Sequence, residues 1–166
     1  MKREKFALWQ WSLVILTIGF IVDHATKFWA EAYLKPKGPV YSAADIPTIT
    51  IIPGCLEFVY AENTGAAFSM MTSQTGILAI ISVIASVGLV WFWTTLSPAE
   101  KWGRYAVALI LSGAVGNLVD RTFRNFVIDF IHAYFRQWSW PVFNIADSCI
   151  CVGAGILAVR FLKNKI

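Results

Sequence analysis

Four long apolar segments limit what this chain can fold into. A helix that crosses the hydrocarbon core of a bilayer needs about 20 mostly apolar residues, and each segment comes close to that length. Because lipid offers the backbone no hydrogen-bond partners, such segments cross as helices. The apolar runs cover residues 6–22, 76–94, 105–119 and 138–159. We therefore expect four transmembrane helices, at roughly residues 6–26, 72–95, 103–121 and 140–161.

The composition agrees with a small integral membrane protein. Hydrophobic residues make up 57% of the chain and charged residues 14%, a balance too apolar for an ordinary soluble domain. The tryptophans cluster near the ends of the apolar runs, as interfacial anchors do. The net charge of +4 is not gathered in a long basic stripe, so we expect anionic lipid as a partner and no nucleic acid. Residues 1–166 are expected to form a single domain.

The first apolar run also has features of a cleavable signal peptide. A basic start precedes it, and Ala30-Glu31-Ala32 follows it like a cleavage site. Asp23, His24 and Lys27, however, separate the run from these small residues, and three more runs follow. We therefore interpret the first span as a retained anchor.

Lysine and arginine predict the orientation, because cytoplasmic loops carry an excess of both. With both termini in the cytoplasm, eight of the 14 basic residues lie inside and six outside. The same orientation brings several acids and one amide to the outer ends of the spans, all facing one compartment. These residues are Asp23, Asn63, Asp120, Asp129 and Asp147.

A β-rich insertion is expected at roughly residues 38–65, between the first two spans. Prolines and glycines break helices there, while Thr48–Ile52 and Leu56–Tyr60 are rich in β-branched and aromatic residues. Pro53-Gly54 fits the turn of a hairpin between them. Since open strand edges are not tolerated in hydrocarbon, this piece should lie at or above the outer interface. The predicted fold class is an all-α polytopic membrane protein of four transmembrane helices with a small extracytoplasmic β-hairpin or cradle.

Two polar helical faces are predicted at similar depth. Residues three and four apart share one face of a helix. One face is formed by Asn117, Asp120 and Arg121, and the other by Asn144, Asp147 and Ser148. Small residues favour close packing of the third and fourth spans, which would bring these faces together. They are Ser112, Gly113, Ala114, Gly116, Gly153, Ala154 and Gly155.

Structural roles compete with functional ones at several of these positions. Asp23 and Lys27 stand in the i, i+4 order that favours a local ion pair. Taken alone, Asp120 and Arg121 are better explained as a buried ion pair that holds two helices together than as catalytic residues. His132 has no second His or Cys at metal-binding spacing, so we expect neither a metal site nor a metal cofactor.

Asp129 and Asp147 are less easily explained as structural, because neither has a cationic neighbour at helical spacing. Carboxylates are costly at membrane depth and usually mark function. Two close carboxylates cannot both ionise cheaply, so they share a proton and can act as base and acid on a water and a carbonyl. The chain has no Gly-rich phosphate loop, Gly-x-Ser-x-Gly elbow or His-Glu-x-x-His helix.

Two other classes of function stay open from the residues alone. A small ion-coupled transporter would also use embedded Asp and Lys residues, but it should place them near the bilayer midplane and often shows paired repeats. A non-catalytic scaffold would tolerate the loss of one aspartate. Cleavage of a peptide by the purified protein separates these alternatives.

Five ordered motifs together extend from Asp23 to Ser148. They are Asp23-x-x-x-Lys27, Asn63-Thr64-Gly65-Ala66-Ala67-Phe68, Gly116-Asn117-Leu118-Val119-Asp120-Arg121, Val127-Ile128-Asp129-Phe130 and Phe143-Asn144-Ile145-Ala146-Asp147-Ser148. In order and spacing they resemble the motifs of the lipoprotein signal peptidases (signal peptidase II). Ser112 departs from the family, which usually has the first glycine of a Gly-Gly pair there, and this affects helix packing more than chemistry.

The resemblance implies an intramembrane aspartic endopeptidase of the bacterial cytoplasmic membrane, with its active site at the outer face. Such an enzyme removes signal peptides from diacylglyceryl-modified prolipoproteins by cutting before the lipidated cysteine, and the family is the target of globomycin. It implies no cofactor. By motif match, Asp129 and Asp147 form the catalytic dyad. The substrate site is implied to be lined by Asn63, Asn117, Asp120, Arg121 and Asn144 and supported by Asp23 and Lys27.

The expected partners are therefore a lipid-modified prolipoprotein and membrane phospholipids, and the chain is expected to be a monomer. A peptide bond within a helix must be extended before it is cut, and polar residues such as Asn63, Asn117 and Asn144 would meet its freed backbone groups. The outer hairpin is placed to close over the substrate as active-site lids do.

Overall fold

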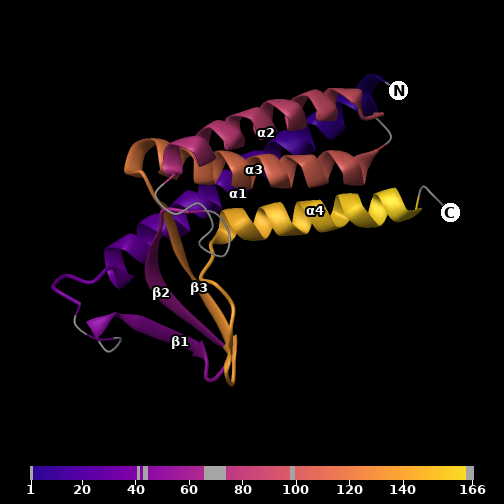
Figure 1. Ribbon diagram of the computed structural model, residues 1–166. Coiled ribbons are helices and arrows are strands. Elements are labelled where there is room, and N and C mark those ends of the chain that lie inside the picture. The colour runs from indigo at the N-terminus through magenta and orange to yellow at the C-terminus, as the bar shows by residue number, and fades with distance from the viewer. Residues whose placement is uncertain (1, 41, 43–44, 66–73, 98–99, 164–166) are drawn as a thin grey trace. The chain divides into compact units, whose positions relative to one another are not determined.

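The computed structural model describes residues 2–40, 42, 45–65, 74–97 and 100–163 (Figure 1). Within these residues the chain forms four long helices, and each is long and apolar enough to cross a membrane. This confirms the prediction of four spans. The helices are α1 (Lys2–Leu34), α2 (Thr75–Thr95), α3 (Lys101–Arg124) and α4 (Ile145–Lys163).

Two helix boundaries differ most from the predicted spans. Helix α1 continues beyond the apolar run to Leu34, because the residues after Asp23 contain no helix breaker before Pro36, which disfavours helix at the residue that precedes it. Helix α4 begins at Ile145 rather than near residue 140, because Trp138–Ser139 form a short strand and Pro141 follows.

The described residues also form one antiparallel sheet in the order β1-β2-β3-β4. The hairpin of β1 (Thr48–Ile52) and β2 (Leu56–Asn63) confirms the expected turn, in which Gly54 has a φ of 74° that few other residues adopt without strain. The sequence did not predict β3 (Val127–Phe135), which pairs with β2, or β4 (Trp138–Ser139).

The chain divides into two compact units. The helical unit comprises Met1–Asp23, Ile80–Val119 and Ile145–Ile166. The sheet unit comprises His24–Ala79 and Asp120–Asn144. The boundaries fall inside α1 and α3, so each of these helices contributes residues to both units.

Small residues set the helix packing in the helical unit. A Cβ added to Gly153 of α4 would lie 2.6 Å from the carbonyl oxygen of Ala106 of α3, and one added to Gly113 would strike the Ala146 carbonyl. The expected close contact of these two helices is therefore confirmed. Gly155 was wrongly included in it, because an added Cβ there would meet nothing within 4 Å. Ser112 of α3 packs against Gly19 of α1.

Aromatic rings form the contact between α1 and the strands in the sheet unit. Trp29 meets Phe58 of β2 edge to face at 5.6 Å and Phe130 of β3 at 6.3 Å, while the two phenylalanines lie 5.8 Å apart. Such tilted pairs are more favourable than stacked ones. They hold β3, and with it Asp129, against the end of α1.

Candidate active site

Asp129 lies on β3 in the sheet unit with only 2% of its surface exposed. Asn63 donates its side-chain amide to Oδ2 at 2.8 Å, and Asn144 donates to Oδ1 at 2.7 Å. Each carboxylate oxygen therefore has an amide donor. Hydrogen bonds of this kind offset the cost of removing a carboxylate from water. The sheet unit thus brings together three of the predicted site residues.

Backbone pairing fixes both asparagines. Asn63 is the last residue of β2 and is paired with Val127, and its Oδ1 accepts the backbone N–H of Gly65 at 2.9 Å, which turns the amide nitrogen toward Asp129. Asn144 follows Phe143, which exchanges two backbone hydrogen bonds with Ile131 of β3. Asn144 also donates to the carbonyl of Ile128.

Asp147 lies in the helical unit, in the first turn of α4. Asn117 of α3 donates its amide to Oδ1 of Asp147 at 2.8 Å. Asp147 is partly exposed, whereas Asn117 is buried. The N-terminal turn of a helix is a favourable place for a negative charge. Asp147 is thus an oriented carboxylate that solvent can reach.

Asp23 supports the start of the same helix. It is fully buried, and its Oδ1 accepts the backbone N–H of Ala146 at 2.9 Å. A Cβ on Gly116 would lie 2.6 Å from its Oδ2, so only glycine leaves room for the carboxylate. Asp23 therefore caps a helix N-terminus one residue from Asp147, which gives this motif position a chemical explanation.

Lys27 and Asp120 form a buried ion pair in the sheet unit. Their Nζ and Oδ2 atoms lie 2.8 Å apart, with 1% and 2% of the side chains exposed. Asp120 also pairs with Arg124 at 3.3 Å and accepts the backbone N–H of Ile128 at 3.4 Å. None of these three partners was predicted for Asp120. This cluster joins α1, α3 and β3 directly beside Asp129.

Arg121 of α3 contacts the asparagine motif. Its Nη2 donates to the carbonyl oxygen of Gly65 at 3.2 Å. The backbone N–H of Gly65 donates to Asn63, whose amide binds Asp129. Arg121 therefore connects α3 to the loop that orients Asn63. Ala66, Ala67 and Phe68 of the same motif lie outside the described residues.

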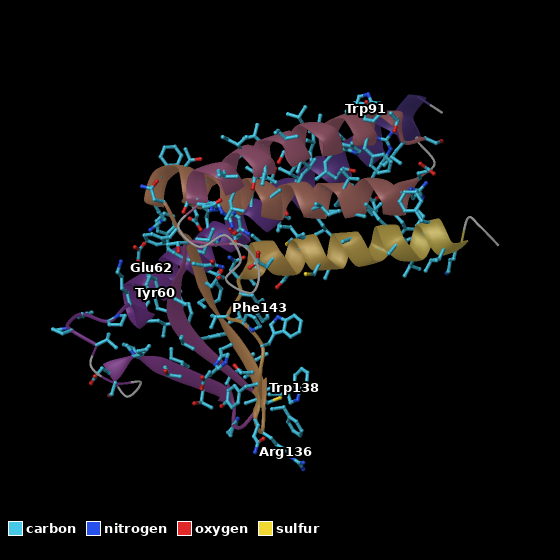
Figure 2. All side chains as sticks on the ribbon, in the orientation of Figure 1. Tyr60, Glu62, Trp91, Arg136, Trp138 and Phe143 are labelled. Atoms are coloured by element: carbon cyan, nitrogen blue, oxygen red, sulfur yellow. The ribbon has the colours of Figure 1, made fainter. Side chains whose placement is uncertain are left out.

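Sequence reasoning missed a polar cluster next to Asn63. Glu62 binds Nζ of Lys35 and the Tyr60 hydroxyl, each at 3.0 Å (Figure 2). Burial raises the pKa of Glu62, but the hydrogen bonds from Lys35 and Tyr60 outweigh it, so the net shift is downward. The pKa of Lys35 is raised by its hydrogen bond to Glu62, and burial raises the pKa of Tyr60 to about 12. The sequence signal that could have revealed this cluster is Glu62, an acidic residue directly before Asn63.

The contacts of His132 are with neighbouring strands, which fits a structural role. Its Nδ1 lies 2.8 Å from Glu57 and its Nε2 lies 2.8 Å from the hydroxyl of Ser139, so the ring links β2, β3 and β4. Among the described residues, no group of three or more His, Cys, Asp or Glu side chains could hold a metal ion.

The predicted site residues thus fall into two groups. The sheet unit joins Asn63 and Asn144 to Asp129, pairs Lys27 with Asp120, and ties Arg121 to Gly65. In the helical unit, Asn117 binds Asp147, and Asp23 accepts the backbone N–H of the preceding residue, Ala146. Both aspartates are held by amide side chains. The approach of Asp129 to Asp147 stays a prediction.

Known proteins are similar to this chain in sequence and in fold. The model of the signal peptidase (SPase) II family matches residues 15–163. Lipoprotein signal peptidase of Syntrophotalea carbinolica is 36% identical, with 98% of this chain and 97% of the relative covered. The enzyme of the same description from Pseudomonas aeruginosa is 36% identical, with 95% and 89% covered.

Two solved structures, both described as bacterial membrane enzymes, have the same fold. One superimposes with a TM-score of 0.83 and covers 93% of this chain and 88% of its own. The other gives 0.77 and covers 92% of each chain. Both are 27% identical in sequence to this chain.

Proposed function

Because the chain belongs to the signal peptidase II family, we propose that it is an aspartic endopeptidase that cuts prolipoproteins immediately before a diacylglyceryl-modified cysteine. Family membership itself makes the chain a peptidase that removes signal peptides from prolipoproteins, and a multi-pass protein of the bacterial inner membrane. The proposal adds the catalytic type, the residues and the bond. The observation that supports it best is the setting of Asp129, a buried carboxylate with one asparagine amide on each oxygen.

The proposed chemistry uses Asp129 and Asp147 as a dyad that shares one proton. The ionised carboxylate accepts a proton from water, and the protonated one donates to the scissile carbonyl oxygen as the water oxygen bonds to the carbonyl carbon. The tetrahedral intermediate then loses the cysteine amine. As the C–N bond breaks, the nitrogen takes the proton that the first carboxylate removed from water, and a hydroxyl of the intermediate returns a proton to the second carboxylate, which restores the starting dyad. The pair titrates as a unit, so neither residue is assigned the base role.

The surrounding residues orient these groups in the proposed enzyme. Asn63 and Asn144 already donate to Asp129, so we assign them first to holding this carboxylate and then to meeting the substrate backbone. Asn117 performs the same task for Asp147. Arg121 and the Lys27–Asp120 pair keep the loop and helices that present these amides in place.

The location of the dyad accounts for the proposed choice of bond. With both termini in the cytoplasm, the dyad lies at the outer membrane face and reaches only peptide bonds held at that depth. A diacylglyceryl group on the adjacent cysteine would hold the bond there, because each buried methylene adds about 0.8 kcal/mol of anchoring. The depth at which the lipid holds the peptide then selects the bond that is cut, and we call this selection the depth ruler.

The test compares two precursors that differ only in the lipid. We expect purified protein in detergent to cut the diacylglyceryl-modified precursor and to cut the unmodified one at least 100-fold more slowly, and EDTA to leave the rate unchanged. Equal rates would refute the depth ruler. Loss of activity with EDTA, restored by a divalent metal, would refute the metal-free dyad. No cleavage of either precursor by correctly folded protein would refute the peptidase proposal.

A further inference from the structure

A groove in the helical unit lies apart from the candidate active site. It has a volume of about 840 Å³ and is formed where α3 begins and α4 ends. Its apolar wall consists of Val152, Ile156 and Val159, which recur at the spacing of one helical face. Val152 and Val159 are 56% and 54% exposed. Because these residues belong to a membrane-spanning helix, acyl chains are the natural material to cover them.

The rim of the same groove is cationic. Lys101, Arg160 and Lys163 contribute three positive charges, and the one acid, Glu100, is paired with Arg160. Positive charge therefore remains in excess. The Nη1 atom of Arg160 is buried, and no hydrogen-bond partner for it exists among the residues that the structure describes. Trp102, 69% exposed, completes the rim in the way that interfacial tryptophans flank a span.

We propose that this groove binds one anionic phospholipid. The lipid phosphate lies against Lys101, Arg160 and Lys163, and one acyl chain follows the wall from Val159 to Val152. A charged rim joined to an apolar wall fits an amphiphile better than a free ion, and the excess of positive charge selects an anionic headgroup over a zwitterionic one. The inference does not depend on the proposed peptidase mechanism, because none of these residues belongs to the candidate active site.

Gly155 supplies a steric test of the site. It lines the groove, and an added Cβ would meet no atom within 4 Å. A leucine at this position should therefore fill the groove without disturbing the contact that Gly153 makes with α3. Gly88 of α2 is the matched control, since its Cβ would also meet open space but it does not line the groove.

The experiment measures lipid binding to the delipidated full-length protein by native mass spectrometry. Phosphatidylglycerol and phosphatidylcholine with identical acyl chains are the two probes. We expect at least a tenfold preference for phosphatidylglycerol. Each of Lys101→Gln and Lys163→Gln should lower its affinity about fivefold, since a basic residue near an anionic headgroup is worth about that factor. Lys37→Gln, an exposed lysine elsewhere, should have no effect.

Gly155→Leu should lower the occupancy of both lipids at this site at least tenfold, while Gly88→Leu should leave it unchanged. Equal affinity for the two lipids would overturn the proposal. A preference that survives both lysine substitutions would overturn it as well, as would Gly155→Leu binding that equals the wild type. Displacement of the lipid by millimolar inorganic phosphate would show an ion site and overturn the phospholipid assignment.

Discussion

The buried Lys27–Asp120 pair should be the most costly contact to break in the sheet unit. At 2.8 Å and an effective dielectric constant of 20, the Coulomb attraction of two unit charges is about 6 kcal/mol. Removing one partner of a buried pair typically costs about 3–5 kcal/mol, because the other charge stays desolvated. Arg124 remains at 3.3 Å from Asp120 and compensates part of the loss. We therefore expect Lys27→Met to destabilise the protein by about 3 kcal/mol.

The assay is equilibrium unfolding in mixed detergent micelles, with Lys37→Met as the control for removing an exposed lysine. The double variant Lys27→Met/Asp120→Asn should recover part of the loss, because it no longer leaves a buried charge with its partner removed. A cost for Lys27→Met of less than about 1 kcal/mol, the range of surface pairs, would refute the reasoning.

Two further predictions concern the loop and strand that hold Asn63. Arg121→Lys should lower kcat/KM about tenfold, because a lysine lacks the planar fork that reaches the Gly65 carbonyl, and unchanged kinetics would contradict this role. The Lys35–Glu62 pair should stabilise the fold most between about pH 4.5 and 10.5. The pKa of Glu62 is lowered in the folded protein, so its contribution disappears as pH falls. The pKa of Lys35 is raised, so its contribution disappears as pH rises. The Tm difference between wild type and Glu62→Gln should therefore shrink below pH 4, and a constant difference would contradict it.

The spans and the first hairpin were predictable from the sequence because each has a local signal. Apolar runs of sufficient length indicated α1 to α4, and Pro53-Gly54 between β-rich stretches indicated β1 and β2. Strand β3 gave no such signal. Its residues Val127–Phe130 are buried in succession, so the alternation that marks a half-exposed strand is missing.

The candidate site was predictable in its residues but not in its contacts. Motif order singled out Asp129, Asn63 and Asn144, yet nothing in their spacing shows that both amides bind the one carboxylate. Likewise, Asp120 has Arg121 beside it in the sequence but pairs with Lys27, which lies on another helix. Such partners are chosen by tertiary packing, which sequence separation does not encode.

The most direct test of the account is single-turnover cleavage of a lipidated precursor by Asp129→Asn and Asp147→Asn. The amide keeps the shape of each side chain but cannot exchange the shared proton. We predict that each variant inserts and folds normally and loses at least 1,000-fold in the rate of the chemical step, while Glu57→Gln, which removes an acid near His132, keeps the wild-type rate. Turnover within tenfold of wild type by either aspartate variant would contradict the dyad.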